Sequence, residues 1–320
     1  MFYTMSLNPV IDRTFYLSEI KDDDVNRISR SMEGAGGKGI NVARMLSNLG
    51  CACTALAFIG GPGGELLKML MESDRISYRY VDSRGDVRSA YNFIGGGRVL
   101  RFNEAGPRIS AEEKERFFRL LGDMDLGKGD IISMSGSLPP GIGEGTYAEI
   151  IERVRDRVSL TALDADGAVL RKGVEAYPDI IKPNLWELER LSGRKIREAG
   201  TLGRVVEGLL NKGISRILLT LGERGAVSFT RDSILLASVP AGGVSGSVGC
   251  GDAFLAGFLC CAGEGSSGSE ALHFAAACGS AKAREKGNLM PSRDSVERIY
   301  GDVSVAEVDI GDLGDLLGDK

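Results

Sequence analysis

The chain has 320 residues, of which 43% are hydrophobic and 26% charged, a composition that provides an ample core for one large domain and excludes wholesale disorder. The formal net charge of −5 disfavours a general binder of nucleic acids or acidic membranes. No apolar stretch reaches the length needed to cross a bilayer, and the first residues lack the pattern of a signal peptide.

The side chains available for chemistry are limited. His273 is the only histidine, which largely excludes a histidine-based triad or a zinc site with several histidines. The 6 cysteines include no C-x-x-C pair and most lie in apolar segments, so we expect free thiols and a cytoplasmic protein. Acid–base chemistry must therefore use carboxylates or lysines.

The first hundred residues mix buried and half-exposed elements. The hydrophobic pattern predicts buried strands over 2–7 and 52–59, half-exposed strands over 13–17 and 24–32, and helices over 40–49 and 64–73. Short strands with many polar residues follow between 78 and 102, where Gly95-Gly96-Gly97 predicts the turn of a hairpin.

Regular alternation of helix and strand begins after Pro107. The pattern predicts helices over 110–121, 146–157, 200–212, 255–261, 269–285 and 292–300, and strands over 130–134, 158–163, 215–220, 225–229 and 233–236. Repeated strand–helix units indicate a mostly parallel sheet covered by helices on both faces. The blocks near 11–33 and 78–105 do not fit this scheme, and we expect them to form one small sheet that projects from a single domain spanning 1–320.

The most informative segment is the turn Ser247-Val248-Gly249-Cys250-Gly251-Asp252, which precedes an apolar helix. The first amides of a helix have no partner within it and carry partial positive charge, so this turn suits an anion, and its glycines let a phosphate approach the backbone. The helix dipole is expected to keep Asp252 ionised, as a general base must be, and to lower the pKa of the Cys250 thiol. The alternative is that Asp252 is an ordinary helix cap.

A second glycine cluster, Gly34-Ala35-Gly36-Gly37-Lys38-Gly39, matches the G-x-G-x-x-G pattern of dinucleotide-binding folds. The acidic residue expected about 20 positions later is absent, and the preceding segment is polar, so a dehydrogenase is a remote alternative. A lysine within a glycine turn at the start of a helix favours an oxyanion or phosphate instead.

Six motifs in order make the chain similar to the ribokinase-like (pfkB) carbohydrate kinases, and within them to the 1-phosphofructokinase and tagatose-6-phosphate kinase branch. The motifs are Leu7-Asn8-Pro9-Val10-Ile11-Asp12, Gly36-Gly37-Lys38-Gly39-Ile40-Asn41-Val42-Ala43, Phe102-Asn103-Glu104-Ala105-Gly106-Pro107, Ser135-Gly136-Ser137-Leu138-Pro139-Pro140-Gly141, Lys182-Pro183-Asn184-Leu185-Trp186-Glu187-Leu188 and the aspartate turn. The resemblance covers residues 4 to about 299. It implies a three-layer α/β/α sandwich with a small β-sheet lid, and transfer of the ATP γ-phosphoryl group to a hydroxyl of a sugar phosphate.

The resemblance also implies roles for individual residues. Asp252 would be the base, and the amides of Gly249, Cys250 and Gly251 would stabilise the transferring phosphoryl group. The acceptor would be bound by residues from the first half of the chain, namely Asp12, Gly36, Gly37, Lys38, Asn41, Arg27, Arg88 and Ser137. Arg27 and Arg88 would clamp a phosphate, although arginines on exposed strands are often simply solvated. The family usually has Arg-x-Asn where this chain reads Arg88-Ser89-Ala90, which leaves open whether Asn92 replaces the missing amide.

The nucleotide site implied by the resemblance lies in the second half of the chain. ATP would be bound by Lys182, Asn184, Thr220, Gly222, Gly225 and Gly251. Asn184 and Glu187 would organise Mg²⁺ through water, which suits a cation that retains its hydration shell. The same spacing also fits a helix-capping pair, and the two interpretations are compatible.

We therefore expect an ATP- and Mg²⁺-dependent kinase, with fructose 1-phosphate as the favoured acceptor at its 6-hydroxyl. Tagatose 6-phosphate and fructose 6-phosphate are the alternatives, because the basic side chains would serve a phosphate at either end of the sugar. A non-catalytic sugar-phosphate sensor is more remote, since Asp252 is present. The resemblance further implies a homodimer formed through the lid strands.

Overall fold

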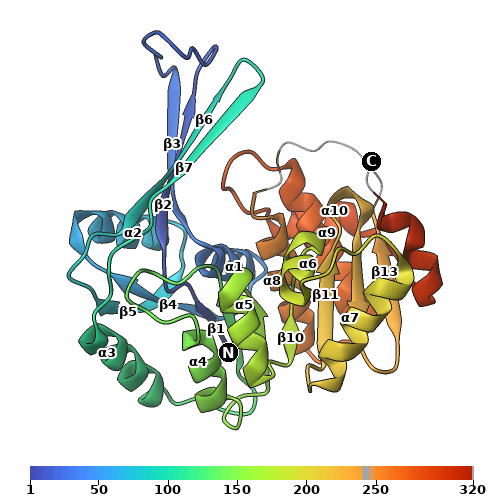
Figure 1. Cartoon of the computed structure of the whole chain (residues 1–320). Helices are drawn as coiled ribbons and strands as arrows, with labels where there is room; N and C mark the ends of the chain where they lie inside the picture. The colour runs from blue at the N-terminus through green and yellow to red at the C-terminus, as the bar shows by residue number, and fades with distance from the viewer. Residues whose placement is uncertain (240–245, 247, 319–320) are drawn as a thin grey trace.

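The computed structural model describes residues 1–239, 246 and 248–318, and its body is built on a 10-stranded sheet with the strand order β14-β13-β12-β11-β10-β9-β8-β1-β4-β5 (Figure 1). The strands are β1 (Phe2–Met5), β4 (Cys53–Ile59), β5 (Ser77–Asp82), β8 (Ile131–Ser135), β9 (Leu160–Asp164), β10 (Ile180–Ile181), β11 (Arg216–Thr220), β12 (Ala226–Phe229), β13 (Ile234–Ser238) and β14 (Ser304–Glu307). The strands from β5 to β11 run parallel, and β12 to β14 continue the sheet in antiparallel fashion.

Helices connect most of the parallel strands. They are α1 (Lys38–Asn48), α2 (Gly61–Ser73), α3 (Ala111–Gly122), α4 (Thr146–Val154), α5 (Gly167–Gly173), α6 (Leu185–Ser192), α7 (Ala199–Asn211), α8 (Cys250–Gly263), α9 (Gly268–Arg284) and α10 (Arg293–Tyr300), with 3₁₀ turns at Val174–Ala176, Gly222–Arg224 and Ile310–Leu316. Within the part of the chain that the structure describes, no helix is both long and apolar enough to cross a membrane.

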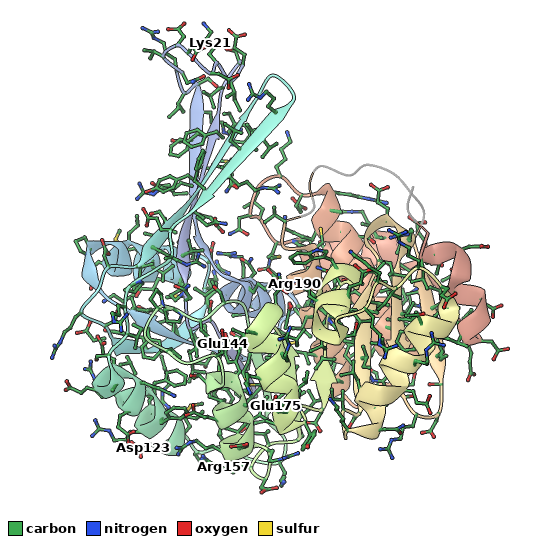
Figure 2. The ribbon with its side chains drawn as sticks, in the orientation of Figure 1. Lys21, Asp123, Glu144, Arg157, Glu175 and Arg190 are labelled. Atoms are coloured by element: carbon green, nitrogen blue, oxygen red, sulfur yellow. The ribbon has the colours of Figure 1, made fainter. Side chains whose placement is uncertain are left out.

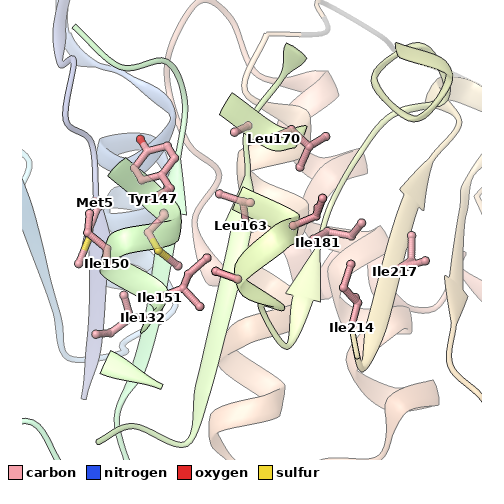
Figure 3. Packing of buried hydrophobic residues seen from close by; sticks show 14 of the residues in the cluster. Met5, Ile132, Tyr147, Ile150, Ile151, Leu163, Leu170, Ile181, Ile214 and Ile217 are labelled. Atoms are coloured by element: carbon pink, nitrogen blue, oxygen red, sulfur yellow. The ribbon is translucent and has the colours of Figure 1, made fainter. Parts of the chain in front are cut away.

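The core lies in layers on the two faces of the sheet. Ile217 and Leu219 of β11 pack in one cluster with side chains from α3 to α7, while Leu218 between them packs in the other with α1, α8, α9 and α10. This division follows from the alternation of side chains along a strand. Figure 3 shows part of the first cluster, where Ile150 and Ile151 of α4 lie beside Ile132 of β8. The predicted parallel sheet with helices on both faces is confirmed.

A separate 4-stranded sheet, which we call the lid, has the order β3-β2-β6-β7 and extends away from the body (Figure 1). Its strands are β2 (Val10–Tyr16), β3 (Arg30–Gly36), β6 (Arg88–Gly95) and β7 (Arg98–Asn103). Lys21, in the loop between β2 and β3, marks its far end (Figure 2). The predicted turn between β6 and β7 is confirmed, because Gly96 and Gly97 have φ angles of 57° and 75° that favour glycine.

The structure corrects the predicted limits of the lid. Residues 78–82 belong to β5, which pairs with β4 at the edge of the large sheet, because this segment supplies a further parallel strand after α2. Residues 24–29 are not a strand but part of the loop at the far end of the lid. The short helix α5 and the edge strand β14 were not predicted; both carry too few apolar residues to produce a clear period.

Candidate active site

A cavity of about 940 Å³ lies where the lid meets the carboxyl ends of β10 and β11 and the start of α8. It brings together most of the residues singled out in the sequence, although they are up to 240 positions apart. Those that line it are Asp12, Gly37, Lys38, Asn41, Arg88, Lys182, Asn184, Glu187, Thr220, Gly222, Gly225, Gly249, Cys250, Gly251 and Asp252. Parallel sheets commonly bind ligands at this edge.

The aspartate turn forms the start of α8, and its first residue, Ser247, lies outside the described residues. Gly249 is the N-cap residue with a φ of 81°, and no side chain of the described residues caps the helix. The interpretation of Asp252 as an ordinary cap is therefore wrong. Its carboxylate is buried, with 6% of the residue exposed, and Oδ2 accepts a hydrogen bond of 2.8 Å from Asn41 Nδ2. The free amides of the turn are thus available to an anion.

Burial acts against both electrostatic expectations about this turn, and the expected fall in the pKa of Cys250 is wrong. Burial raises the pKa of Asp252, and the neighbouring carboxylate of Asp164 raises it further, while Lys38 and the amide of Asn41 act in the opposite direction. Burial likewise raises the pKa of the Cys250 thiol. In both cases the loss of hydration outweighs the helix dipole, whose effect on a nearby charge is modest.

Asp164, the last residue of β9, organises two cations under the cavity. It is fully buried, and its oxygens lie 2.9 Å from Lys38 Nζ and 3.2 Å from Lys182 Nζ. Burial alone would raise the pKa of Asp164, but the two ammonium groups outweigh it and lower the pKa. A Cβ at Gly251 would lie 3.1 Å from Lys182 Nζ, so this ammonium sits directly beside the amide turn. The Lys182 ammonium and the adjacent turn amides are donors suited to phosphate.

The lid contributes the carboxylate of Asp12 and the guanidinium of Arg88 to the same cavity. Burial raises the pKa of Asp12 to about 6, in spite of the opposing charges of Arg44 and Arg88. The Arg88 side chain is held by three hydrogen bonds to backbone carbonyls. Its Nε and Nη2 donate to the carbonyl of Asn8 at 3.2 Å and 3.0 Å, and its Nη1 donates to the carbonyl of Glu104 at 3.2 Å. Burial lowers the pKa of Arg88.

Some predicted acceptor residues do not line the cavity. Arg27 is exposed in the loop between β2 and β3, and Ser137 accepts a hydrogen bond of 3.3 Å from Asn8 Nδ2. Gly36 lies under Asp12, where it leaves room for the carboxylate, since an added Cβ would come within 2.1 Å of Asp12 Oδ2. Asn92 is two residues beyond Ala90 on the same strand face and does not line the cavity either.

The residues predicted to bind the nucleotide all line this cavity. Asn184 and Glu187 form a reciprocal cap on α6, with two hydrogen bonds of 2.8 Å, so the capping interpretation is confirmed. Glu187 Oε1 lies 3.7 Å from Lys38 Nζ. Gly222 and Gly225 have φ angles of 64° and 95° and shape the turn that follows Thr220.

Sequence reasoning missed three polar residues and one helix face. Asp164 ends β9, a strand that was predicted, and a carboxylate at the carboxyl end of a parallel strand is a signal that could have identified this residue. Lys282 is buried in α9 and Asn288 lies in the following loop, and the sequence around them gives no comparable signal. The face of α9 that lines the cavity carries small residues at helical spacing, which are Ala276, Gly279, Ser280 and Ala283, and ends at Arg284.

Comparison with known proteins places this site in context. Residues 5–294 match the family model described as pfkB family carbohydrate kinase. The chain is 33% identical over 309 residues to a 1-phosphofructokinase of Borreliella burgdorferi, covering 96% of this chain and 99% of that protein, and 32% identical over 259 residues to a 1-phosphofructokinase of Bacillus subtilis, covering 81% and 84%. The crystal structure of phosphofructokinase-2 from Escherichia coli in complex with potassium superposes with a TM-score of 0.89 at 25% identity, covering 94% of this chain and 98% of that one. This chain therefore belongs to the pfkB family of carbohydrate kinases, which are phosphotransferases with a sugar hydroxyl as acceptor.

Proposed function

We propose that this protein is an ATP-dependent 1-phosphofructokinase, which converts fructose 1-phosphate and ATP into fructose 1,6-bisphosphate and ADP. The observation that carries the proposal is the shared cavity, in which Asp12 and Arg88 of the lid face the catalytic turn of Gly249 to Asp252. The names of the two bacterial relatives support the choice of fructose 1-phosphate. Fructose 6-phosphate is the second candidate, because the Escherichia coli structure of similar fold is a phosphofructokinase-2.

The acceptor would bind between the lid and the catalytic turn. Arg88 is half-buried, and no carboxylate pairs with its guanidinium within salt-bridge distance among the described residues, so it suits the phosphate of the sugar. Asp12 would accept hydrogen bonds from the sugar hydroxyls. These contacts would direct the free hydroxyl at the far end of the sugar toward Asp252.

Asp252 would take the proton of that hydroxyl as it attacks the γ-phosphorus of ATP. A carboxylate whose pKa is raised by burial is a stronger base than an exposed one. The turn amides and Lys182 would stabilise the charge that spreads over the transferring oxygens.

The nucleotide would lie against α9, where the small residues leave space for a flat base. The donor set of the described residues fits a hydrated Mg²⁺ rather than one held by protein ligands alone. Glu187 Oε2 and Asn184 Oδ1 are used in the helix cap, and no group of three or more His, Cys, Asp or Glu side chains among the described residues gathers into a metal site. Glu187 Oε1 would hold the ion through water, and the ion would neutralise phosphate charge.

The lid offers a surface for a second copy of the chain. Phe15 and Phe93 stack at 5.1 Å between ring centroids, and Phe102, which is 56% exposed, lies against Phe93 at 6.1 Å. Because side chains alternate along a strand, these rings lie on the face of the lid opposite Asp12. We propose that this face pairs with its equivalent in a homodimer and that Arg27 lies near the partner. A phosphofructokinase-2 of Escherichia coli has been solved in a tetrameric inhibited form, so related chains do associate.

The six free cysteines agree with a cytoplasmic enzyme.

The test is an assay of ADP release with fructose 1-phosphate, fructose 6-phosphate, tagatose 6-phosphate, ribose and free fructose as separate acceptors. The proposal expects the highest kcat/KM with fructose 1-phosphate. A higher value with another phosphosugar would correct the acceptor, and activity confined to an unphosphorylated sugar would contradict the proposed phosphate site. Sedimentation at micromolar concentration tests the dimer, which a species of 34.0 kDa alone would contradict.

A further inference from the structure

The loop that follows α9 reaches from the catalytic end of the body toward the base of the lid (Figure 1). Asn288 in this loop donates from Nδ2 to Asp12 Oδ2 at 2.7 Å and to the carbonyl of Ala35 at 3.1 Å. One amide group therefore joins strands β2 and β3 of the lid to the loop. No motif in the sequence pointed to this residue.

The glycine-rich strand β3 makes room for this contact. Gly34 and Gly36 flank Ala35 on the same face of the strand, because side chains two residues apart point the same way. A Cβ at Gly34 would lie 4.0 Å from Asn288 Nδ2, and one at Gly36 would collide with Asp12 Oδ2. The absence of a side chain at Gly36 therefore leaves the room that the Asp12 carboxylate occupies, while a Cβ at Gly34 would make only an ordinary contact with the Asn288 amide.

The other end of the loop is fixed to the catalytic turn. Lys282 of α9 is 1% exposed, and its Nζ donates to the carbonyl of Gly287 at 2.9 Å. Its Cε lies 3.1 Å from the position that a Cβ of Gly249 would occupy. Because Gly287 precedes Asn288, the position of the Asn288 amide is linked through Lys282 to the turn that carries Asp252.

We propose that Asn288 is a positioning residue of the acceptor site, which holds the Asp12 carboxylate in the orientation that binds the sugar, while Lys282 holds its loop against the catalytic turn. The proposal rests on the proposed function, in which Asp12 binds the acceptor. Both contacts of Asn288 go to acceptor oxygens, so the position requires a donor. With Oδ2 fixed by Asn288, Oδ1 of Asp12 is the oxygen left for a sugar hydroxyl.

The contact also bears on the protonation of Asp12. The charged groups that act on this carboxylate are Arg44 of α1, Arg88 of β6 and Asp252 of α8. Burial raises the pKa of Asp12 to about 6, and the Asn288 hydrogen bond lowers it, because it favours the ionised form. Loss of the amide donor should therefore raise the pKa of Asp12 further, toward neutral pH.

The experiment compares Asn288→Ala and Asn288→Asp with wild type and with Leu289→Ala as the matched control. Leu289 is the next residue of the same loop and is 52% exposed. For each protein, KM for the acceptor, KM for ATP and kcat are measured, and the acceptor kcat/KM is followed from pH 5 to 8. Acceptor binding without ATP, measured by calorimetry, gives the same comparison independently of turnover. The acceptor used is whichever phosphosugar the wild type prefers, so an error in the proposed substrate does not affect the comparison.

The proposal expects Asn288→Ala to raise the acceptor KM about 10-fold or more, as loss of a hydrogen bond to a charged group does, with the ATP KM within about twofold of wild type. Asn288→Asp, which has the same shape but places an acceptor against Asp12 and Ala35, should be worse. The acidic limb of the acceptor kcat/KM profile should move to higher pH in Asn288→Ala. Leu289→Ala should match wild type. A wild-type acceptor KM in Asn288→Ala overturns the proposal. Equal rises in both KM values, or the same defect in Leu289→Ala, also overturn it, because they indicate general damage to the loop.

Discussion

Replacement of Asp252 by Asn tests the assignment of the catalytic base. The change keeps the shape of the side chain and an oxygen that can accept the hydrogen bond from Asn41. It removes the group that takes the proton of the acceptor hydroxyl. Loss of a positioned base lowers the rate about 10²–10⁴-fold, which corresponds to about 3–5 kcal/mol of transition-state stabilisation. Substrate binding should change little, because no contact to the acceptor phosphate is lost.

The same variant should be more stable than wild type at neutral pH. The pKa of Asp252 is raised in the folded protein, so the folded state binds a proton on this group more readily than the unfolded state does. The ionised carboxylate therefore weakens the fold at pH values above its unfolded pKa, and the penalty is present in full once pH exceeds the folded pKa. A neutral asparagine removes the penalty. The gain in stability should disappear as pH falls toward the usual range for aspartate.

The assays are coupled ADP release and thermal unfolding at pH 4 to 8. Asp294→Asn is the matched control, because Asp294 is an exposed aspartate in the first turn of α10. We expect the control to retain wild-type kcat, and Asp252→Asn to lose activity while its melting temperature at pH 7 rises. Turnover at the wild-type rate in Asp252→Asn would refute the base assignment. A fall in its melting temperature at pH 7 would refute the account of the raised pKa.

Three further substitutions probe the rest of the site. Asp164→Asn leaves the buried Lys182 and the half-buried Lys38 without their shared carboxylate, so unfolding in urea at pH 7 should show a loss of about 3–5 kcal/mol. Because the pKa of Asp164 is lowered in the folded protein, the difference in stability between the two proteins should shrink as pH falls through the usual pKa range of aspartate. A loss below about 1 kcal/mol at pH 7 would contradict the ion network. Gly36→Ala places a Cβ against Asp12, so steady-state kinetics should show a raised acceptor KM with an unchanged ATP KM. Gly122→Ala, which meets nothing within 4 Å, is its control, and equal behaviour of the two would contradict the role of Gly36. Arg88→Met should raise the KM for a phosphorylated acceptor about 10–100-fold, and an unchanged KM would remove Arg88 from the phosphate site.

The repeating part of the fold could be predicted because its segments obey local rules. The strand now seen as β11 and the helix α9 each have the length and apolar pattern of buried elements, and their predicted limits differ from the observed ones by at most one residue. The segment 78–82 was assigned to the wrong sheet because a half-exposed edge strand has the same alternation in either sheet. Its place is decided by pairing with β4, which is a contact between distant segments.

The candidate site was predicted where a residue type and its position in a motif determine the contact. Asp252, Lys38 and Asn184 line the cavity as expected. The direction of the pKa shift at Asp252 was not predicted, because it depends on burial and on Asp164, which is 88 positions away in the chain. Asn288 was missed for the same reason, since its partners lie in the first 35 residues.

The measurement that tests the central claim most directly is ³¹P NMR of a reaction containing the purified enzyme, ATP, Mg²⁺ and fructose 1-phosphate. The account predicts loss of the γ-phosphate signal of ATP together with a second phosphomonoester signal on the same sugar, at carbon 6, and no such product with Asp252→Asn over the same time. Unchanged fructose 1-phosphate in the presence of wild-type enzyme that phosphorylates another sugar would contradict it.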